Sequence, residues 1–141
     1  MAPRVAYSQP QAGPQGFART KKVFGGQVSL ATTDLVTTAQ TAIMRVPAGF
    51  VVTNIYALAS DMDSDGTPTL AFNLGDSGSA ARLLSASTIG QAGTSTTSLA
   101  AAGLYYQVTA DTDIILQPSA NAATAVAGTL TTYLEGFMAN P

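Results

Sequence analysis

Short runs of alternating apolar and polar residues, separated by turn residues, fill the chain from Val23 onward. A period of two is typical of β-strands, because successive side chains point to opposite faces of a sheet. The clearest run places Leu70, Phe72 and Leu74 on one face, between polar or small residues on the other. We expect strands at 23–30, 41–46, 50–60, 69–75, 81–85, 104–110, 113–118 and 128–138. For 81–85 a short helix is the alternative.

The spacing of these runs predicts an all-β fold. No stretch shows a helical period supported by capping residues, and turn signals recur at the spacing found in sandwiches. Segment 50–60 is apolar on both of its faces, which predicts a strand that packs on the core and is also covered from outside. We therefore expect one antiparallel β-sandwich, similar to a jelly roll.

The first 22 residues have a different character. They are rich in Pro and Gln and lack apolar periodicity, so they cannot bury enough surface to become ordered alone. We expect two parts, an extended basic arm at 1–22 and a sandwich body at 23–141. The arm carries a net charge of +4 and the body −6.

An arm of this kind is either a solvated tail or a docking segment, and we favour docking on a protein. Four charges with few aromatic residues among them make a poor nucleic-acid surface, so nucleic acid is disfavoured as a partner. Aromatic residues give a large contact area at small entropic cost and would anchor the arm. The residues expected to bind the partner are Arg4, Tyr7, Phe17, Arg19, Lys21 and Lys22.

Composition limits the remaining possibilities. Charged residues make up 10% of the chain, against about 25% in an average globular domain. A soluble monomer needs a charged surface, so we expect copies of the chain or a larger assembly to cover much of it. The sequence has no Cys and no His. It shows no signal peptide and no apolar run of membrane-spanning length, so we expect assembly in the host cytoplasm without a membrane.

The stretch DMDSDG, residues 61–66, begins like a helix–loop–helix calcium site. Asp61, Asp63 and Asp65 would fill the first three ligand positions, but the position of the essential bidentate Glu is Phe72. Both flanks also read as strands. We interpret the stretch as a turn, a hairpin connection between two strands, and expect no metal and no cofactor.

Two other motifs suggest catalysis, and each is rejected for its own reason. GDSG at 75–78 matches the nucleophile loop of trypsin-like proteases, but a chain without His has no base for Ser77. Carboxylate pairs can act without His, yet Asp111 and Asp113 flank Thr112 in an ordinary turn pattern. We expect no catalytic residue and no enzyme activity.

Residues 44–134 resemble the head decoration, or cement, proteins of tailed bacteriophages. The resemblance is carried by a PAGFVVT corner, an acidic loop before GTPTL, a GD turn, STIGQAG, YYQVTADTDI and a closing AGTLTTYL strand. It implies a non-enzymatic β-sandwich, often a homotrimer, fixed outside the capsid where copies of the major capsid protein meet. The arm at 1–22 has no counterpart in this pattern.

We therefore expect a virion structural protein on the capsid exterior that stabilises the head and has the major capsid protein and itself as partners. A tail, baseplate or head-fibre adaptor is the first alternative. A carbohydrate-binding or receptor-binding module is the second, and the absence of Trp counts against it. A basic arm that binds DNA inside the head is a further alternative.

Overall fold

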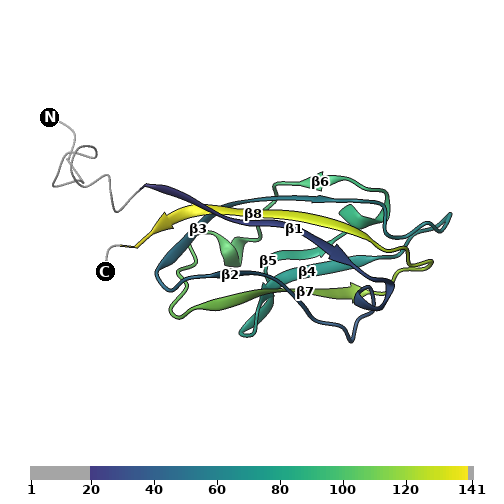
Figure 1. Ribbon diagram of the computed structural model, residues 1–141, viewed down its shortest axis with the longest axis horizontal. Coiled ribbons are helices and arrows are strands. Elements are labelled where there is room, and N and C mark those ends of the chain that lie inside the picture. The colour runs from purple at the N-terminus through teal and green to yellow at the C-terminus, as the bar shows by residue number, and fades with distance from the viewer. Residues whose placement is uncertain (1–19, 140–141) are drawn as a thin grey trace, which may run out of the picture.

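A computed structural model describes residues 20–139, which form two antiparallel four-stranded sheets packed face to face (Figure 1). The all-β sandwich is thereby confirmed. The strands are β1 (Lys21–Leu30), β2 (Thr41–Val46), β3 (Phe50–Ala59), β4 (Ala71–Asp76), β5 (Ser79–Ser87), β6 (Ser95–Thr96), β7 (Thr112–Ala120) and β8 (Gly128–Met138). Three short 3-10 helices lie in the connections, η2 (Thr32–Asp34), η3 (Ile89–Gln91) and η4 (Ala101–Gly103).

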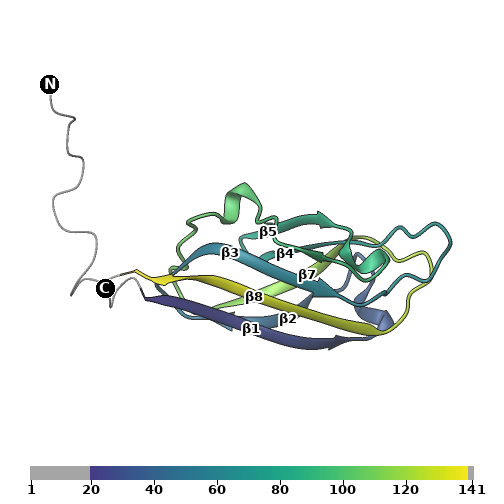
Figure 2. The ribbon, with the colours of Figure 1, turned by 90° about the horizontal axis from the view of Figure 1, so that it is seen from above.

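The strand order identifies the topology as a jelly roll. One sheet has the order β1-β8-β3-β6 and the other β2-β7-β4-β5. Strand pairs β1 with β8, β2 with β7, β3 with β6 and β4 with β5 are all antiparallel, so each pair nests inside the one before it. This is how two Greek keys combine in a jelly roll. Figure 2 shows β1, β8 and β3 side by side in the first sheet.

Large apolar side chains from both sheets fill the space between them. Leu70, Phe72 and Leu74 are fully buried, as their alternation predicted. On the first sheet Phe24 meets Phe50 edge to face, with ring centroids 4.9 Å apart. Phe24 and Phe50 come from β1 and β3, the two neighbours of β8. Their contact therefore spans the strand between them, β8.

A bulge in β3 changes which of its residues face the core. The register with β8 shifts between Val52 and Asn54, and after the shift Ile55 points inward with Val52. Tyr56 and Leu58 consequently point outward and are 41% and 54% exposed. Within one copy the second half of β3 is thus buried on its core face only, although Val51 is buried. Coverage of the outward side chains by another molecule stays a prediction.

Segment 81–85 is a strand, as expected, and forms the centre of β5. Two other expected elements differ in the structure. Segment 104–110 is not a regular strand, because Tyr105 has a positive φ of 59° that interrupts the extended backbone. Segment 60–70 is not a hairpin, since it carries the chain from β3 in one sheet to β4 in the other.

Within residues 20–139 no helix has both the length and the apolar character that a bilayer crossing requires. β1 begins at Lys21, two residues before the expected start of the body. The start of β1 lies beside the end of β8, where Lys21 is opposite Phe137 (Figure 1). Any segment that precedes β1 thus leaves the body at this end of the first sheet.

Candidate partner-binding surfaces

Of the residues expected to contact a partner, the structure places two. Lys21 and Lys22 are the first two residues of β1, and both are exposed. The Nζ of Lys21 lies 3.0 Å from Oε2 of Glu135 on β8. The other residues expected to bind the partner lie outside the described part of the chain: Arg4, Tyr7, Phe17 and Arg19.

The outer surface of the first sheet carries a group of exposed apolar side chains, which we call the outer face. It is formed by Val23, Tyr56, Leu58 and Tyr133. Tyr133 lies in the middle strand, β8, directly opposite Tyr56 on β3 and Gly25 on β1. Gly25 adds no side chain to this face, and Tyr133 is 41% exposed.

A groove of about 270 Å³ crosses this outer face beside β6. Its apolar lining includes Tyr56, Leu58 and Tyr133, and its polar lining includes Ser95, Thr96 and Thr131. None of these side chains carries a charge. The groove is thus shaped and lined to receive an apolar side chain rather than an ion.

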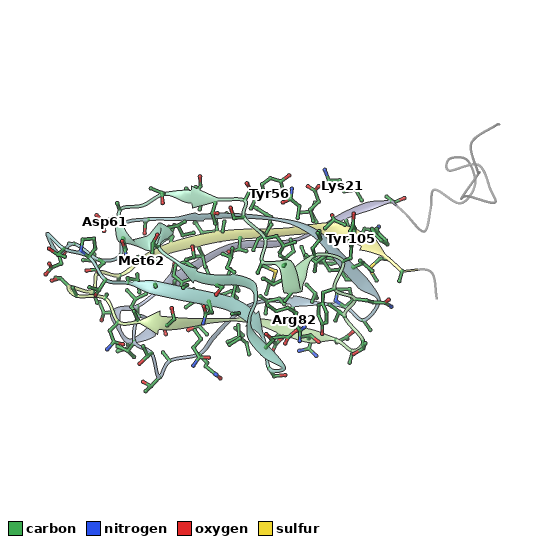
Figure 3. The ribbon with its side chains drawn as sticks, turned by 180° about the vertical axis from the view of Figure 1, so that it is seen from behind. Lys21, Tyr56, Asp61, Met62, Arg82 and Tyr105 are labelled. Carbon is green, nitrogen blue, oxygen red and sulfur yellow. The ribbon has the colours of Figure 1, made fainter. Side chains whose placement is uncertain are left out.

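A second apolar feature, which we call the protrusion, consists of Leu104 and Tyr105. The two residues are 50% and 68% exposed. The backbone around them is fixed to the edge of β3, because the Tyr105 N–H donates to the Val52 carbonyl at 2.7 Å and the Val52 N–H donates to the Tyr106 carbonyl at 3.0 Å. Figure 3 shows Tyr105 near the Lys21 end of the molecule, away from Asp61 and Met62.

Tyr106, the residue that follows the protrusion, is held in place by an arginine. The guanidinium of Arg82 lies 3.9 Å from the centre of the Tyr106 ring, at which distance a cation–π attraction operates. Its Nε donates to Oδ2 of Asp76 at 2.8 Å. Asp76 is 7% exposed; burial raises its pKa, but Arg82 and the N–H groups of Ser79 and Gly78 outweigh burial and hold that pKa below the usual value.

The acidic loop is organised around one buried carboxylate. Asp63 is 1% exposed, and its Oδ2 accepts hydrogen bonds from the N–H groups of Thr69, Leu70 and Ala123. Its Oδ1 accepts one from Thr124. Burial alone would raise the pKa of Asp63. The four N–H donors lower it by more than that, so the pKa of Asp63 lies well below the usual range.

Asp63 therefore joins the 60–70 connection to the loop between β7 and β8. Asp61 and Asp65 serve the same region, since Asp61 accepts from the Asp63 N–H and Asp65 from the Thr67 N–H. In residues 20–139 no group of three or more acidic side chains is arranged to hold a metal ion. The oxygens of this motif are used to fix main chain.

The remaining catalytic candidates also have structural partners. Asp111 accepts a hydrogen bond from the Ala48 N–H at 3.0 Å, and Asp113 pairs with Arg45 at 2.9 Å. Ser77 is exposed in the turn between β4 and β5. Among the described residues, the most conspicuous exposed apolar features are the outer face and the protrusion.

Sequence reasoning did not find either surface. The apolar pattern of 50–60 does not show that Tyr56 and Leu58 lie on the exposed face, because a bulge adds a residue without any mark in that pattern. Tyr105 lies in the segment 104–110 that we expected to be a strand, and paired tyrosines favour a strand, so the sequence does not reveal its positive φ.

No protein-family model and no curated protein matches the sequence. Among solved structures, the chain is similar to a chain of the capsid asymmetric unit of cyanophage Pam1, with 33% identity over 97% of this chain and 98% of that one, and a TM-score of 0.81. A chain from the capsid of Ralstonia phage GP4 is 20% identical, with 95% and 91% of the two chains covered and a TM-score of 0.73.

A chain from the acid-stable capsid of Helicobacter pylori bacteriophage KHP30 is 12% identical, over 85% and 89% of the two chains, with a TM-score of 0.60. At these lower identities the GP4 and KHP30 chains establish the shared fold alone. The Pam1 match joins sequence identity to nearly complete coverage of both chains. The chain therefore belongs to the family of bacteriophage capsid proteins to which the Pam1 chain belongs, and it is a structural protein of the virion.

Proposed function

We propose that the protein is a decoration, or cement, protein that binds the outside of the phage head where copies of the major capsid protein meet, and that it catalyses no reaction. The observation that carries this proposal is the Pam1 capsid match over 97% of the chain. The carboxylates considered for catalysis are engaged with main-chain N–H groups or arginines, in keeping with a structural role.

The physical basis of cementing is selective binding to the assembled shell. A protein that binds only the joined capsid subunits stabilises the joined state by mass action. The jelly-roll body suits this role, because all four nested strand pairs and a continuous core hold it rigid. A rigid body bound across a boundary transfers load between the subunits on either side.

The arm at 1–22 forms the main attachment to the shell. Tyr7 and Phe17 occupy apolar pockets, while Arg4, Arg19 and Lys22 pair with acidic side chains of the capsid protein. Support comes from the net charge of +4 on this segment against −6 on the body. Lys21 contributes less to docking, because it already pairs with Glu135 within the sheet.

The body forms a closed cyclic homo-oligomer, and a homotrimer is the form we propose. Charged residues make up only 10% of the chain, and the outer face is apolar and exposed. Both features favour association of copies over dispersal as single copies. A trimer matches a site where three capsid subunits meet.

Addition of the purified chain to finished heads tests the function. Heads that lack this protein are prepared from the phage that carries its gene, and release of DNA on heating is followed with an intercalating dye. The full chain is expected to bind and to raise the release temperature, because its site is accessible from outside. A chain without residues 1–19, which keeps β1 intact, is expected to stay folded and not to bind.

Failure of the full chain to bind finished heads, or binding without any change in release temperature, would contradict the proposal. Binding to tails rather than heads would favour an adaptor role. Binding by the shortened chain equal to that of the full chain would overturn the role of the arm alone.

A further inference from the structure

Tyr105 holds a backbone conformation that its side chain disfavours. Its φ of 59° lies in the left-handed region, which is uncommon for any residue except Gly and unfavourable for a bulky one. Yet Tyr105 is 68% exposed, so packing in the core of its own molecule does not explain why this residue is there. Strain of this kind persists where the surrounding structure enforces it, and it concentrates at binding sites.

The surroundings do enforce it. The main chain on both sides of Tyr105 bonds to Val52, and further along the segment the Val108 N–H donates to the Phe50 carbonyl at 2.8 Å. The stack of Arg82 on Tyr106 holds the next residue in place. The Tyr105 ring is therefore presented on a rigid support, and a pre-organised tyrosine is a typical anchor of protein interfaces.

The groove on the outer face is chemically matched to such an anchor. Tyr56, Leu58 and Tyr133 line it, and its volume is about 270 Å³. On the outward positions of β1, β8 and β3 the charged residues are Lys21 and Glu135, and they neutralise each other in a pair. An incoming aromatic ring would thus meet no isolated charge that must lose its water.

The protrusion and the groove occupy different places along β3. The protrusion is bonded at Val52, whereas the groove begins at Tyr56, about 13 Å further along a strand that rises roughly 3.3 Å per residue. One copy can therefore offer its protrusion to one neighbour and its groove to another. Contacts of this head-to-tail type close into a ring when the rotation between copies allows it.

We propose that the protrusion, Leu104 and Tyr105, of one copy inserts into the Tyr56–Leu58–Tyr133 groove of a second copy, and that this contact builds the cyclic oligomer. The inference rests on the proposed function, because it names the surface by which the decoration protein meets its own copies.

The area available supports a second copy as the occupant. Weighted by their exposed fractions and taking about 200 Å² for each full side chain, the five side chains bury together about 500 Å². A standard interface of about 1,600 Å² is a little over half apolar, so this contact supplies roughly half of the apolar area required. The rest of the outer face, including Val23, adjoins it on the same sheet.

Sedimentation velocity of the full chain over a range of concentrations tests the proposal without any capsid. The wild type is expected to form a discrete oligomer. Tyr105→Gly is expected to weaken self-association at least about 30-fold, the effect of losing an interface hot spot. At low concentration the same variant should melt no lower than the wild type, because Gly accepts the positive φ without strain.

Leu58→Glu, which places a charge in the groove, should have the same effect on association. Val36→Glu is the matched control, since Val36 is also exposed, at 37%, but lies outside both features. A mixture of Tyr105→Gly and Leu58→Glu is expected to form a one-to-one heterodimer, because the first keeps a groove and the second keeps a protrusion.

A monomeric wild type overturns the proposal, as does an oligomer that both variants leave intact. If Tyr105→Gly leaves the oligomer unchanged but loses binding in a separate assay with heads, the protrusion docks on the capsid protein instead and the proposal is overturned. Since the measurement uses no heads, its failure leaves the proposed decoration function to be judged separately.

Discussion

The buried pair of Asp76 and Arg82 leads to a prediction with a built-in control. Arg82→Met keeps an unbranched stem like that of Arg but removes the guanidinium, so Asp76 loses bonds of 2.8 and 3.3 Å. Breaking a buried pair by removing one partner costs about 3–5 kcal/mol. Here Asp76 keeps the N–H donors of Gly78 and Ser79, which reduces the loss, while the lost stack on Tyr106 adds about 0.5–1 kcal/mol.

We expect Arg82→Met to lower the free energy of unfolding by about 2–4 kcal/mol, or the melting temperature by roughly 10 °C. The control is Arg45→Met in the same sheet. Arg45 and Asp113 form an equally short pair of 2.9 Å, but their side chains are 62% and 48% exposed. An exposed pair contributes about 1 kcal/mol or less.

Urea unfolding followed by circular dichroism, at one protein concentration for all variants, measures both losses. The reasoning requires the Arg82 loss to exceed the Arg45 loss clearly. Equal losses for the two variants would refute it, because burial would then not be what makes the Asp76 pair strong.

Two further predictions follow from the loops and strands. Gly25→Ala should destabilise the protein strongly, since a Cβ there would overlap the Thr132 carbonyl oxygen and the φ of Gly25 is 136°. Gly26→Ala is the control and should have a small effect, because the space around Gly26 is open. Thermal melts of the two variants give the comparison. For Asp63 the folded-state pKa lies below the ordinary 3.8, so the carboxylate stabilises the fold above that pH and this contribution is lost as the pH falls below it. Asp63→Asn should therefore lower the melting temperature at pH 7 more than at pH 2.5, and a difference that stays constant with pH would contradict the role of the charge.

Alternation of side chains was enough to predict the class of fold. Leu70, Phe72 and Leu74 on β4, and Leu130 and Leu134 on β8, face the core as their spacing requires. The pattern reports which face of a strand is buried, because burial is what selects the apolar residues. It does not report which strand lies beside which, so the crossing of 60–70 from one sheet to the other was read as a hairpin.

The candidate surfaces and the role of the acidic loop were harder to predict, each for a physical reason. A bulge near Thr53 shifts the alternation by one residue, and the sequence looks equally apolar whether or not the shift occurs. The exposed positions of Tyr56 and Leu58 depend on that shift. The importance of Asp63 was hidden as well, because two of its four donors, Ala123 and Thr124, lie 60 and 61 residues further along the chain.

The division of the chain into an arm and a body remains a prediction for residues 1–19. Within the described part, the strand β1 takes in Lys21 and Lys22. The basic segment thus leads directly into an edge strand of the first sheet, beside β8. This arrangement anchors any pull on the arm in the sheet rather than in a loop.

Electron microscopy of the intact virion tests the central claim most directly. The account predicts density for this jelly roll on the outer surface of the head, at sites where several major capsid proteins meet, with an extended segment running from the start of β1 onto the shell. Density for the jelly roll inside the head, or confined to the tail, would contradict it.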